Sequence, residues 1–200
     1  VAALQKAERP LIVSGSGVIW SRAWGELQPF VEAAGVPFYT TPQGRGVVPD
    51  DHDYSYLAMR SSAFRDADLI VVLGTRMNYI IGHASPPRFG PNATIARIDI
   101  DSAEIATAAR YVDIPIVGDC KAVLGQLLAG IKGKLNPERF AAWRKKLHDG
   151  EMAKRSAAGA NRPAEDGDIH PVRMLEAVRD FAKRDEIVFA HERRMHRQRG

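Results

Sequence analysis

Short apolar runs and segments with helical periodicity alternate along the first 131 residues of the chain. The longest run, residues 69–73, has no polar interruption and ends at Gly74. A strand with one solvent-exposed face would alternate apolar and polar residues, so a continuous run indicates a strand buried on both faces of a parallel sheet. Four shorter segments have similar character, which predicts further strands over residues 11–13, 36–40, 94–100 and 113–117.

Predicted helices separate these strands. They cover residues 2–8, 21–34 (with Ser21 as N-cap), 61–67, the segment after the capping residue Asp101, and 119–131. Glu104, three residues after Asp101, is expected to complete a capping box. Strands that alternate with helices require a parallel sheet with right-handed crossovers. We therefore predict an α/β fold for residues 1–131, with a three-layer, doubly wound parallel sheet of the Rossmann-like type.

The remainder of the chain has a different pattern. Residues 136–154 form a largely polar predicted helix inside a helical linker that we place at 132–168. A helix over 169–183 and a strand over 186–190 begin a second α/β unit, which is left incomplete within residues 169–200. The basic tail from residue 191 has no apolar pattern and is expected to be disordered. The chain opens on Val1 without a methionine and is expected to begin inside a longer protein.

Charge and composition exclude several classes of function. The net charge of +4 divides into −2 over residues 1–131 and +6 over 132–200, so the predicted domain is not a basic nucleic-acid-binding surface. No apolar run approaches the roughly 18–20 residues that cross a bilayer. The single cysteine, Cys120, favours a reducing, cytoplasmic location and a buried, unreactive thiol. The histidines lack metal-ligand spacing, and we predict no metal site.

Ligands of doubly wound sheets bind beyond the carboxyl ends of the strands, which directs attention to three turns. Gly15, Ser16 and Gly17 follow the first predicted strand, where glycine lets backbone N–H groups approach a pyrophosphate. The third glycine of a dinucleotide fingerprint is missing, so an ordinary tight turn is the alternative. Asp99 ends a later strand and could bind a ribose diol; its alternative role is a helix cap, for which Asp101 is better placed.

Further candidates are less specific. Arg76 follows the central strand and could bind phosphate or stack on adenine, or else form an ion pair with Asp99 or Asp101. Arg45 lies between two glycines and could meet a phosphate or remain solvated. Asp119 opens a helix and suits a cap better than a ligand contact.

Several segments together resemble the central domain of thiamine-diphosphate-dependent enzymes. They are residues 9–17, 37–38, 41–52, 67–68, 74–78, 98–101 and 117–119, in that order. Residues 59–61 and 76–89 are most similar to oxalyl-CoA decarboxylases and 2-hydroxyacyl-CoA lyases, followed by acetolactate synthases. Residues 169–190 resemble the entry into the third, diphosphate-binding domain of these enzymes, whereas the tail departs from their pattern.

The resemblance implies that the domain binds ADP, the ADP part of CoA, or FAD. Asn78 and Tyr79 stand where flavin-binding relatives usually carry acidic residues, which makes FAD the less expected ligand. The implied cofactor-binding residues are Gly15, Ser16, Gly17, Arg45, Arg76, Asn78, Asp99, Ile100 and Asp119. Thiamine diphosphate and Mg²⁺ would be bound by domains outside this chain, so we expect no catalytic residue here and no activity from the chain alone.

The same resemblance implies that the intact enzyme forms or cleaves C–C bonds next to a carbonyl. Its partners would be its own other domains and subunits, in a homo-oligomer such as a dimer or tetramer, without nucleic acid or membrane. Two alternatives remain open at this point. The domain could be a scaffold with a vestigial nucleotide site, or a stand-alone Rossmann-like protein that binds NAD.

Overall fold

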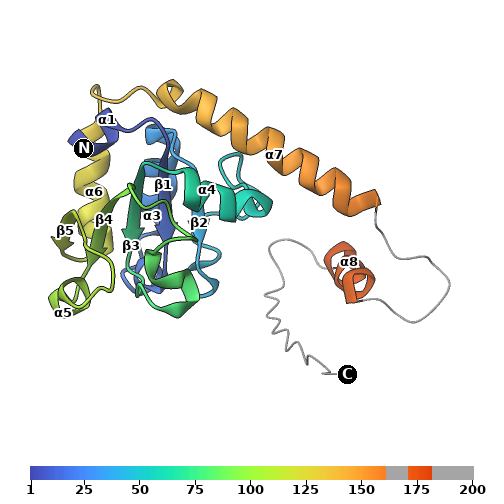
Figure 1. The fold of residues 1–200 in the computed structure, drawn as a ribbon, viewed down its shortest axis with the longest axis horizontal. Helices are drawn as coiled ribbons and strands as arrows, with labels where there is room; N and C mark the ends of the chain where they lie inside the picture. The colour runs from blue at the N-terminus through green and yellow to red at the C-terminus, as the bar shows by residue number, and fades with distance from the viewer. Residues whose placement is uncertain (161–170, 182–200) are drawn as a thin grey trace. The chain divides into compact units, whose positions relative to one another are not determined.

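The computed structural model describes residues 1–160 and 171–181 of the chain (Figure 1). Two compact units are present, and the first of them comprises Val1–Ala157. The described residues of the second unit are 158–160, which end a helix that begins in the first unit, and helix α8, Pro171–Phe181, within the predicted helix 169–183. No helix in these described ranges is long and apolar enough to cross a membrane.

The first unit is built on a five-stranded sheet in which every strand is parallel to its neighbours. Its order is β2-β1-β3-β4-β5, and the strands are β1 Pro10–Ser14, β2 Phe38–Thr40, β3 Leu69–Leu73, β4 Thr94–Asp99 and β5 Ile114–Val117. Ile12 is in register with both Phe38 and Val71, and Val71 is in register with Ala96. The predicted doubly wound parallel sheet is confirmed.

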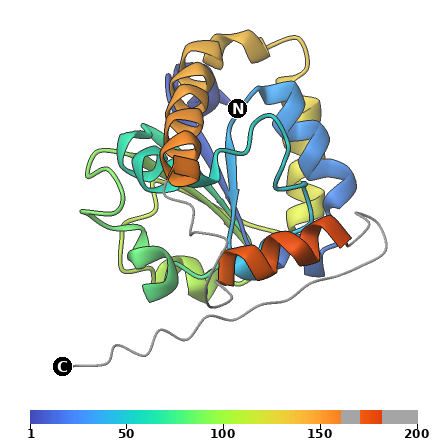
Figure 2. The same cartoon turned by 90° about the vertical axis from the view of Figure 1, so that its right-hand side faces the viewer.

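Alternate residues of β3 face two different layers of helices. Leu69, Val71 and Leu73 belong to the apolar cluster that contains α3 and α6, whereas Ile70 and Val72 belong to the cluster that contains α4 and α7. Figure 2 shows α3 (blue) and α6 (yellow) on one face of the sheet and α7 (orange) on the other. The helices of this unit are α1 Ala2–Lys6, α2 Ser16–Trp20, α3 Trp24–Ala34, α4 Arg60–Asp66, α5 Ser102–Ala106, α6 Cys120–Ile131 and α7 Ala141–Ala160.

The predicted helix start at Ser21 is wrong. A separate short helix, α2, begins at Ser16 directly after the β1 turn, and Arg22 adopts a left-handed conformation with φ of 54°. This break delays α3 until Trp24. Ser21 is instead the C-cap residue of α2, and its hydroxyl donates to the carbonyl of Val18, 3.2 Å away.

Helix α7 packs on the domain, although its polar sequence predicted a linker from residue 132. Trp143 and Leu147 are buried in the α4-side cluster, and the Trp143 indole N–H donates to the carbonyl of Pro10 at 3.1 Å. Arg144 and Glu151 on the same side of α7 are also buried. Because the buried side of this helix contains charged residues, a hydrophobicity pattern does not identify it. The rest of the predicted linker, residues 161–168, the predicted strand 186–190 and the tail lie outside the described residues.

Candidate functional site

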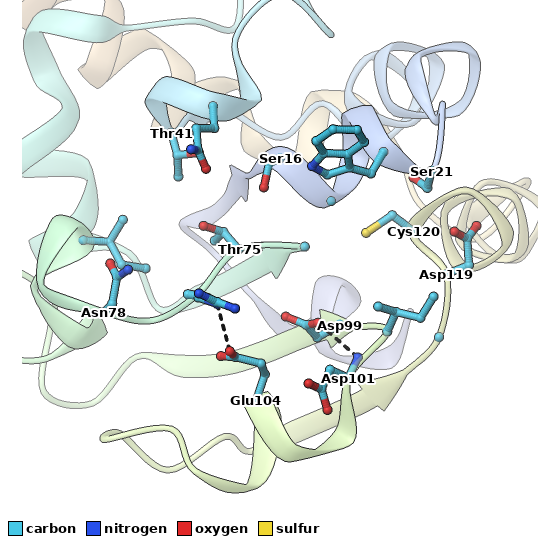
Figure 3. Close-up of a pocket in the computed structure, with 18 of the residues that line it drawn as sticks. Ser16, Ser21, Thr41, Thr75, Asn78, Asp99, Asp101, Glu104, Asp119 and Cys120 are labelled. Atoms are coloured by element: carbon cyan, nitrogen blue, oxygen red, sulfur yellow. Dashed lines mark hydrogen bonds and ion pairs between the residues drawn. The ribbon is translucent and has the colours of Figure 1, made fainter. Parts of the chain in front are cut away.

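A cavity of about 780 Å³ lies beyond the carboxyl ends of the strands (Figure 3). The turn after each of the five strands contributes to its wall. It includes the point between β1 and β3 where the chain direction across the sheet reverses, which is where open α/β sheets bind their ligands. The lining residues used below are Ser16, Gly17, Trp20, Ser21, Thr41, Gln43, Thr75, Arg76, Asn78, Asp99, Ile100, Asp101, Glu104, Asp119 and Cys120.

The turns after β1, β2 and β3 are packed against one another through glycine. A Cβ atom at Gly17 would lie 2.7 Å from the Cα of Gly74, and one at Gly44 would lie 2.5 Å from the carbonyl oxygen of Ser14. A Cβ at Gly15 would collide with Thr75. Gly74 itself has φ of 52°, in the left-handed region that favours glycine. These glycines are required because three backbone segments share one small space.

This packing also engages the amides that the sequence suggested for phosphate binding. The Gly15 N–H donates to the carbonyl of Leu73 at 2.9 Å, and the Gly17 N–H donates to the carbonyl of Gly74 at 2.8 Å. Of the two interpretations that the sequence left open, these hydrogen bonds favour the ordinary tight turn, because each amide is already bonded to a carbonyl at or just after the end of β3. Gly17 and Ser16 still line the cavity, whereas Gly15 does not.

Hydroxyl and amide side chains line the wall formed by the first three turns. Besides Ser16, they are Ser21, Thr41, Gln43 and Thr75, none of which the sequence singled out. Such groups can both donate and accept hydrogen bonds. Four of them shared a positional signal, because Ser16, Thr41, Gln43 and Thr75 each lie within a few residues of a strand end; Ser21 lies at the end of α2.

The opposite wall is organised by Arg97, a residue of β4 that sequence reasoning missed. Its side chain is only 1% exposed, and its guanidinium lies 3.1 Å from the Asp99 carboxylate and 3.4 Å from that of Glu104. The guanidinium also donates to the backbone carbonyl of Glu104. The second Asp99 oxygen accepts from the Asp101 N–H at 3.2 Å. A charged residue inside a strand predicted to be buried was the available signal, since such a charge needs partners.

Glu104 joins this buried group to Arg76. The Arg76 Nε lies 2.9 Å from a Glu104 carboxylate oxygen, and the Arg76 side chain is 75% exposed. Figure 3 shows this ion pair at the cavity wall. Arg76 therefore forms an ion pair, as the alternative interpretation predicted, but with Glu104 and not with Asp99 or Asp101. The capping box is likewise incomplete, because the Glu104 carboxylate is directed to arginines.

Asp101 and Asp119 cap the helices that begin at this wall. The Asp101 carboxylate accepts from the Ala103 N–H at 2.8 Å, and the Asp119 carboxylate accepts from the Ala122 N–H at 3.1 Å. Both predicted caps are present, and both residues also line the cavity. Their carboxylates add negative charge beside Asp99.

The pKa of the Cys120 thiol reflects its burial and the negative charges near it. Its thiol is buried, and burial together with the negative charges of Asp119 and Asp99 raises its pKa to about 12. A thiol with such a pKa is a poor nucleophile at neutral pH. This agrees with the prediction of an unreactive cysteine.

The remaining predicted residues divide between the cavity and the surface. Asn78 and Ile100 line the cavity. Arg45 does not: its side chain is 59% exposed, and its Nε lies 3.8 Å from the Asp50 carboxylate. Trp20, which was not predicted, contributes a lining side chain that is 83% exposed.

Comparison with known proteins agrees with this architecture. The family model for the thiamine pyrophosphate enzyme central domain matches residues 1–127. The chain is 41% identical to a 2-hydroxyacyl-CoA lyase of Arabidopsis thaliana over 132 residues, which is 66% of this chain and 23% of the relative. It is 28% identical to the oxalyl-CoA decarboxylase of Escherichia coli, over 94% of this chain and 33% of the relative.

Two further similarities extend the comparison. An acetolactate synthase of Mycobacterium avium is 32% identical, over 92% of this chain and 30% of the relative. A solved structure from Mycobacterium smegmatis, assigned to the thiamin diphosphate-dependent enzymes, superposes with a TM-score of 0.54 at 24% identity, over 64% of this chain and 26% of the other. The chain thus spans about a quarter to a third of the length of these proteins. It belongs to the thiamine pyrophosphate enzyme family, of which residues 1–127 are the central domain.

Proposed function

We propose that the central domain binds an adenine nucleotide in the cavity beyond its sheet. We also propose that the protein acts, with its further domains, on C–C bonds next to a carbonyl, as its lyase, decarboxylase and synthase relatives suggest. One observation carries the nucleotide proposal. The Asp99 carboxylate ends a strand inside the cavity, where a ribose diol can donate to it.

The two walls of the cavity suggest how such a ligand would be oriented. The ribose would lie near Asp99, and the diphosphate would lie toward the wall of Ser16, Thr41 and Thr75, away from the carboxylates. Figure 3 shows Ser16 and Thr41 across the cavity from Asp99, with Thr75 between them. The volume of about 780 Å³ falls within the range of roughly 300–1,000 Å³ found for small-molecule sites.

ADP is the ligand that we favour over FAD. Asn78 lines the cavity at the place where the resemblance led us to expect an acidic residue for flavin binding. The exposed indole of Trp20 provides a flat apolar surface at the cavity, on which an adenine could stack.

The described residues give no independent support for a thiamine diphosphate site. Among them no group of three or more His, Cys, Asp or Glu side chains is placed to hold a metal ion. The family implies that this cofactor acts as an electron sink during bond cleavage. We propose that further domains of the protein and a second subunit supply its site.

A structural spacer with a vestigial site is the second candidate. The hydrogen bonds of the Gly15 and Gly17 amides to the end of β3 favour it, because they remove two expected phosphate donors. In that case a nucleotide would find hydroxyl groups and one exposed arginine but no amide pair.

Calorimetric titration of the full chain with ADP, FAD and NAD distinguishes the candidates. The proposal predicts ADP binding that is lost in the Asp99→Ala/Arg76→Ala double variant. Binding to none of the three ligands would leave the spacer, whereas preference for NAD would favour a different dinucleotide site. Circular dichroism of the double variant would confirm that it remains folded.

A further inference from the structure

One wall of the cavity carries more negative than positive charge. Asp99, Asp101, Glu104 and Asp119 supply four carboxylates, and two guanidinium groups, those of Arg76 and Arg97, lie against them. The wall therefore retains two net negative charges even when both arginines are counted. Arg76 is the one cationic side chain among the described residues that line the cavity.

These charges are held in place. Arg97 is 1% exposed and pairs with the carboxylates of both Asp99 and Glu104, so withdrawal of either would remove one of the two carboxylate partners of a buried guanidinium. Asp101 and Asp119 are fixed by the helix N-termini that they cap. Arg76 is held at 2.9 Å by Glu104, which offsets its charge.

The field of these groups extends across the wall. Cys120 follows Asp119 in sequence, yet the charge of Asp99 on the neighbouring strand also contributes to its raised pKa. The Gly118 N–H donates to the backbone carbonyl of Asp99 at 2.9 Å, which fixes the two turns beside each other. Asp99 and Asp119 therefore belong to adjoining turns that both line the cavity.

A ribose with free hydroxyls and a ribose that carries a phosphate differ sharply at such a wall. Free 2′- and 3′-hydroxyls donate hydrogen bonds to a carboxylate. A phosphate offers acceptors and negative charge, and like charges brought together in a binding site oppose association. A compensating arginine is the usual device for a phosphorylated ribose, and here that arginine is already paired.

We propose that this wall selects nucleotides with an unmodified ribose and rejects those with a phosphorylated ribose. This inference rests on the proposed nucleotide site. Asp101 and Asp119 are the specificity-determining residues, since Asp99 and Glu104 are balanced by Arg97 and Arg76. The ADP part of CoA, which carries a 3′-phosphate, would therefore be excluded, although the relatives named above include enzymes of CoA thioesters.

Coenzyme A and 3′-dephospho-CoA form a matched pair of probes, because they differ only in that phosphate. Titration of the full chain should show dephospho-CoA binding at least about tenfold more tightly than CoA. The ratio should fall as ionic strength rises, since salt screens charge repulsion. ADP serves as the reference ligand for the site itself.

The Asp101→Asn/Asp119→Asn double variant tests the mechanism. Asparagine is as good an N-cap as aspartate, so both helices keep their caps while two charges are removed. The preference for dephospho-CoA should then shrink at least about threefold. Asp149→Asn, an exposed residue of α7 that pairs with Lys145, is the control and should leave the ratio unchanged.

Each outcome bears on a different statement. Equal or tighter binding of CoA, with ADP still bound, would overturn this inference and leave the proposed nucleotide site standing. A preference that persists undiminished in the double variant would overturn the role of Asp101 and Asp119. Failure of ADP and both coenzymes to bind would overturn the proposed function, and this inference with it.

Discussion

The guanidinium of Arg97 and the carboxylate of Asp99 lie 3.1 Å apart and project from the same face of β4, two residues apart. Their side chains are 1% and 13% exposed. The pleat of β4 thus places the buried guanidinium of Arg97 next to Asp99, the carboxylate at the end of this strand that lines the cavity. The orientation of Asp99 is set by Arg97 of its own strand together with the N–H of Asp101.

Arg97→Met should destabilise the protein by about 3 kcal/mol, because Asp99 and Glu104 would lose their shared cation in a buried setting. Urea unfolding followed by circular dichroism measures this loss. Arg45→Met is the matched control: its ion pair is exposed and 3.8 Å long, so a change below about 0.5 kcal/mol is expected. Equal losses in the two variants would contradict a structural role for the Arg97 network.

Gly17→Ala should lower the melting temperature, because the new methyl group would lie 2.7 Å from the Gly74 backbone, which cannot move aside as a side chain can. Overpacking of this kind typically costs about 1–3 kcal/mol. Gly125→Ala provides the contrast within α6. That position has open space around a Cβ, and alanine should stabilise the helix by roughly 0.5–1 kcal/mol. A Gly17→Ala protein as stable as the parent would show that the turns are not tightly packed.

Glu151→Ala should detach the segment around Ala58 from α7. The buried Glu151 carboxylate accepts from the Ala58 N–H at 2.7 Å, and the Lys154 ammonium donates to the Ala58 carbonyl at 2.8 Å. Loss of the carboxylate removes a charge-assisted hydrogen bond to a partly buried amide, at a cost of about 1.5–3 kcal/mol. Hydrogen exchange at residues 57–59 should become faster.

Asp149→Ala, two residues earlier on α7, removes an exposed ion pair with Lys145 and should change stability by less than about 0.5 kcal/mol. Unchanged exchange at residues 57–59 in Glu151→Ala would show that this anchor is unimportant.

Cys120 should resist thiol reagents in the native state and react readily after denaturation. Its folded pKa of about 12 lies above the ordinary thiol value, so the folded protein retains the proton while the unfolded chain loses it. The thiol contribution to stability is complete below the unfolded pKa of about 8.5 and is lost as pH rises toward about 12.

Comparison with Cys120→Ala isolates this effect, since the chain has no other cysteine. The parent should lose stability relative to this variant over that alkaline range. Rapid modification of native Cys120 at neutral pH would contradict the prediction.

The sheet could be predicted from the sequence because a strand buried on both faces leaves an uninterrupted apolar run, as at residues 69–73. Local capping was also readable: Asp101 and Asp119 act within three residues of their own positions. The partner of Arg76 could not be predicted from the sequence. It is Glu104, whose carboxylate is positioned by Arg97, and the role of Arg97 depends on its burial in the folded protein.

The packing of α7 on the domain could not be predicted from the sequence for a related reason. Arg144 and Glu151 are buried through hydrogen bonds to backbone groups of distant segments, Gly35 and Ala58. Polar residues satisfied in this way resemble solvent-exposed residues in a sequence pattern. Only the folded structure supplies the carbonyl and amide that they meet.

The contact of the turns after β1, β2 and β3 through Gly15, Gly17, Gly44 and Gly74 constrains how this domain can diversify. A side chain added to one turn requires a retreat by another, so single substitutions there are selected against and compensating pairs would have to arise together. Two positions on the cavity wall outside this contact, Trp20 and Ile100, are 83% and 74% exposed and can change without displacing another turn. Ligand preference can therefore change by single substitutions at those positions, while the glycine contact between the three turns stays the same.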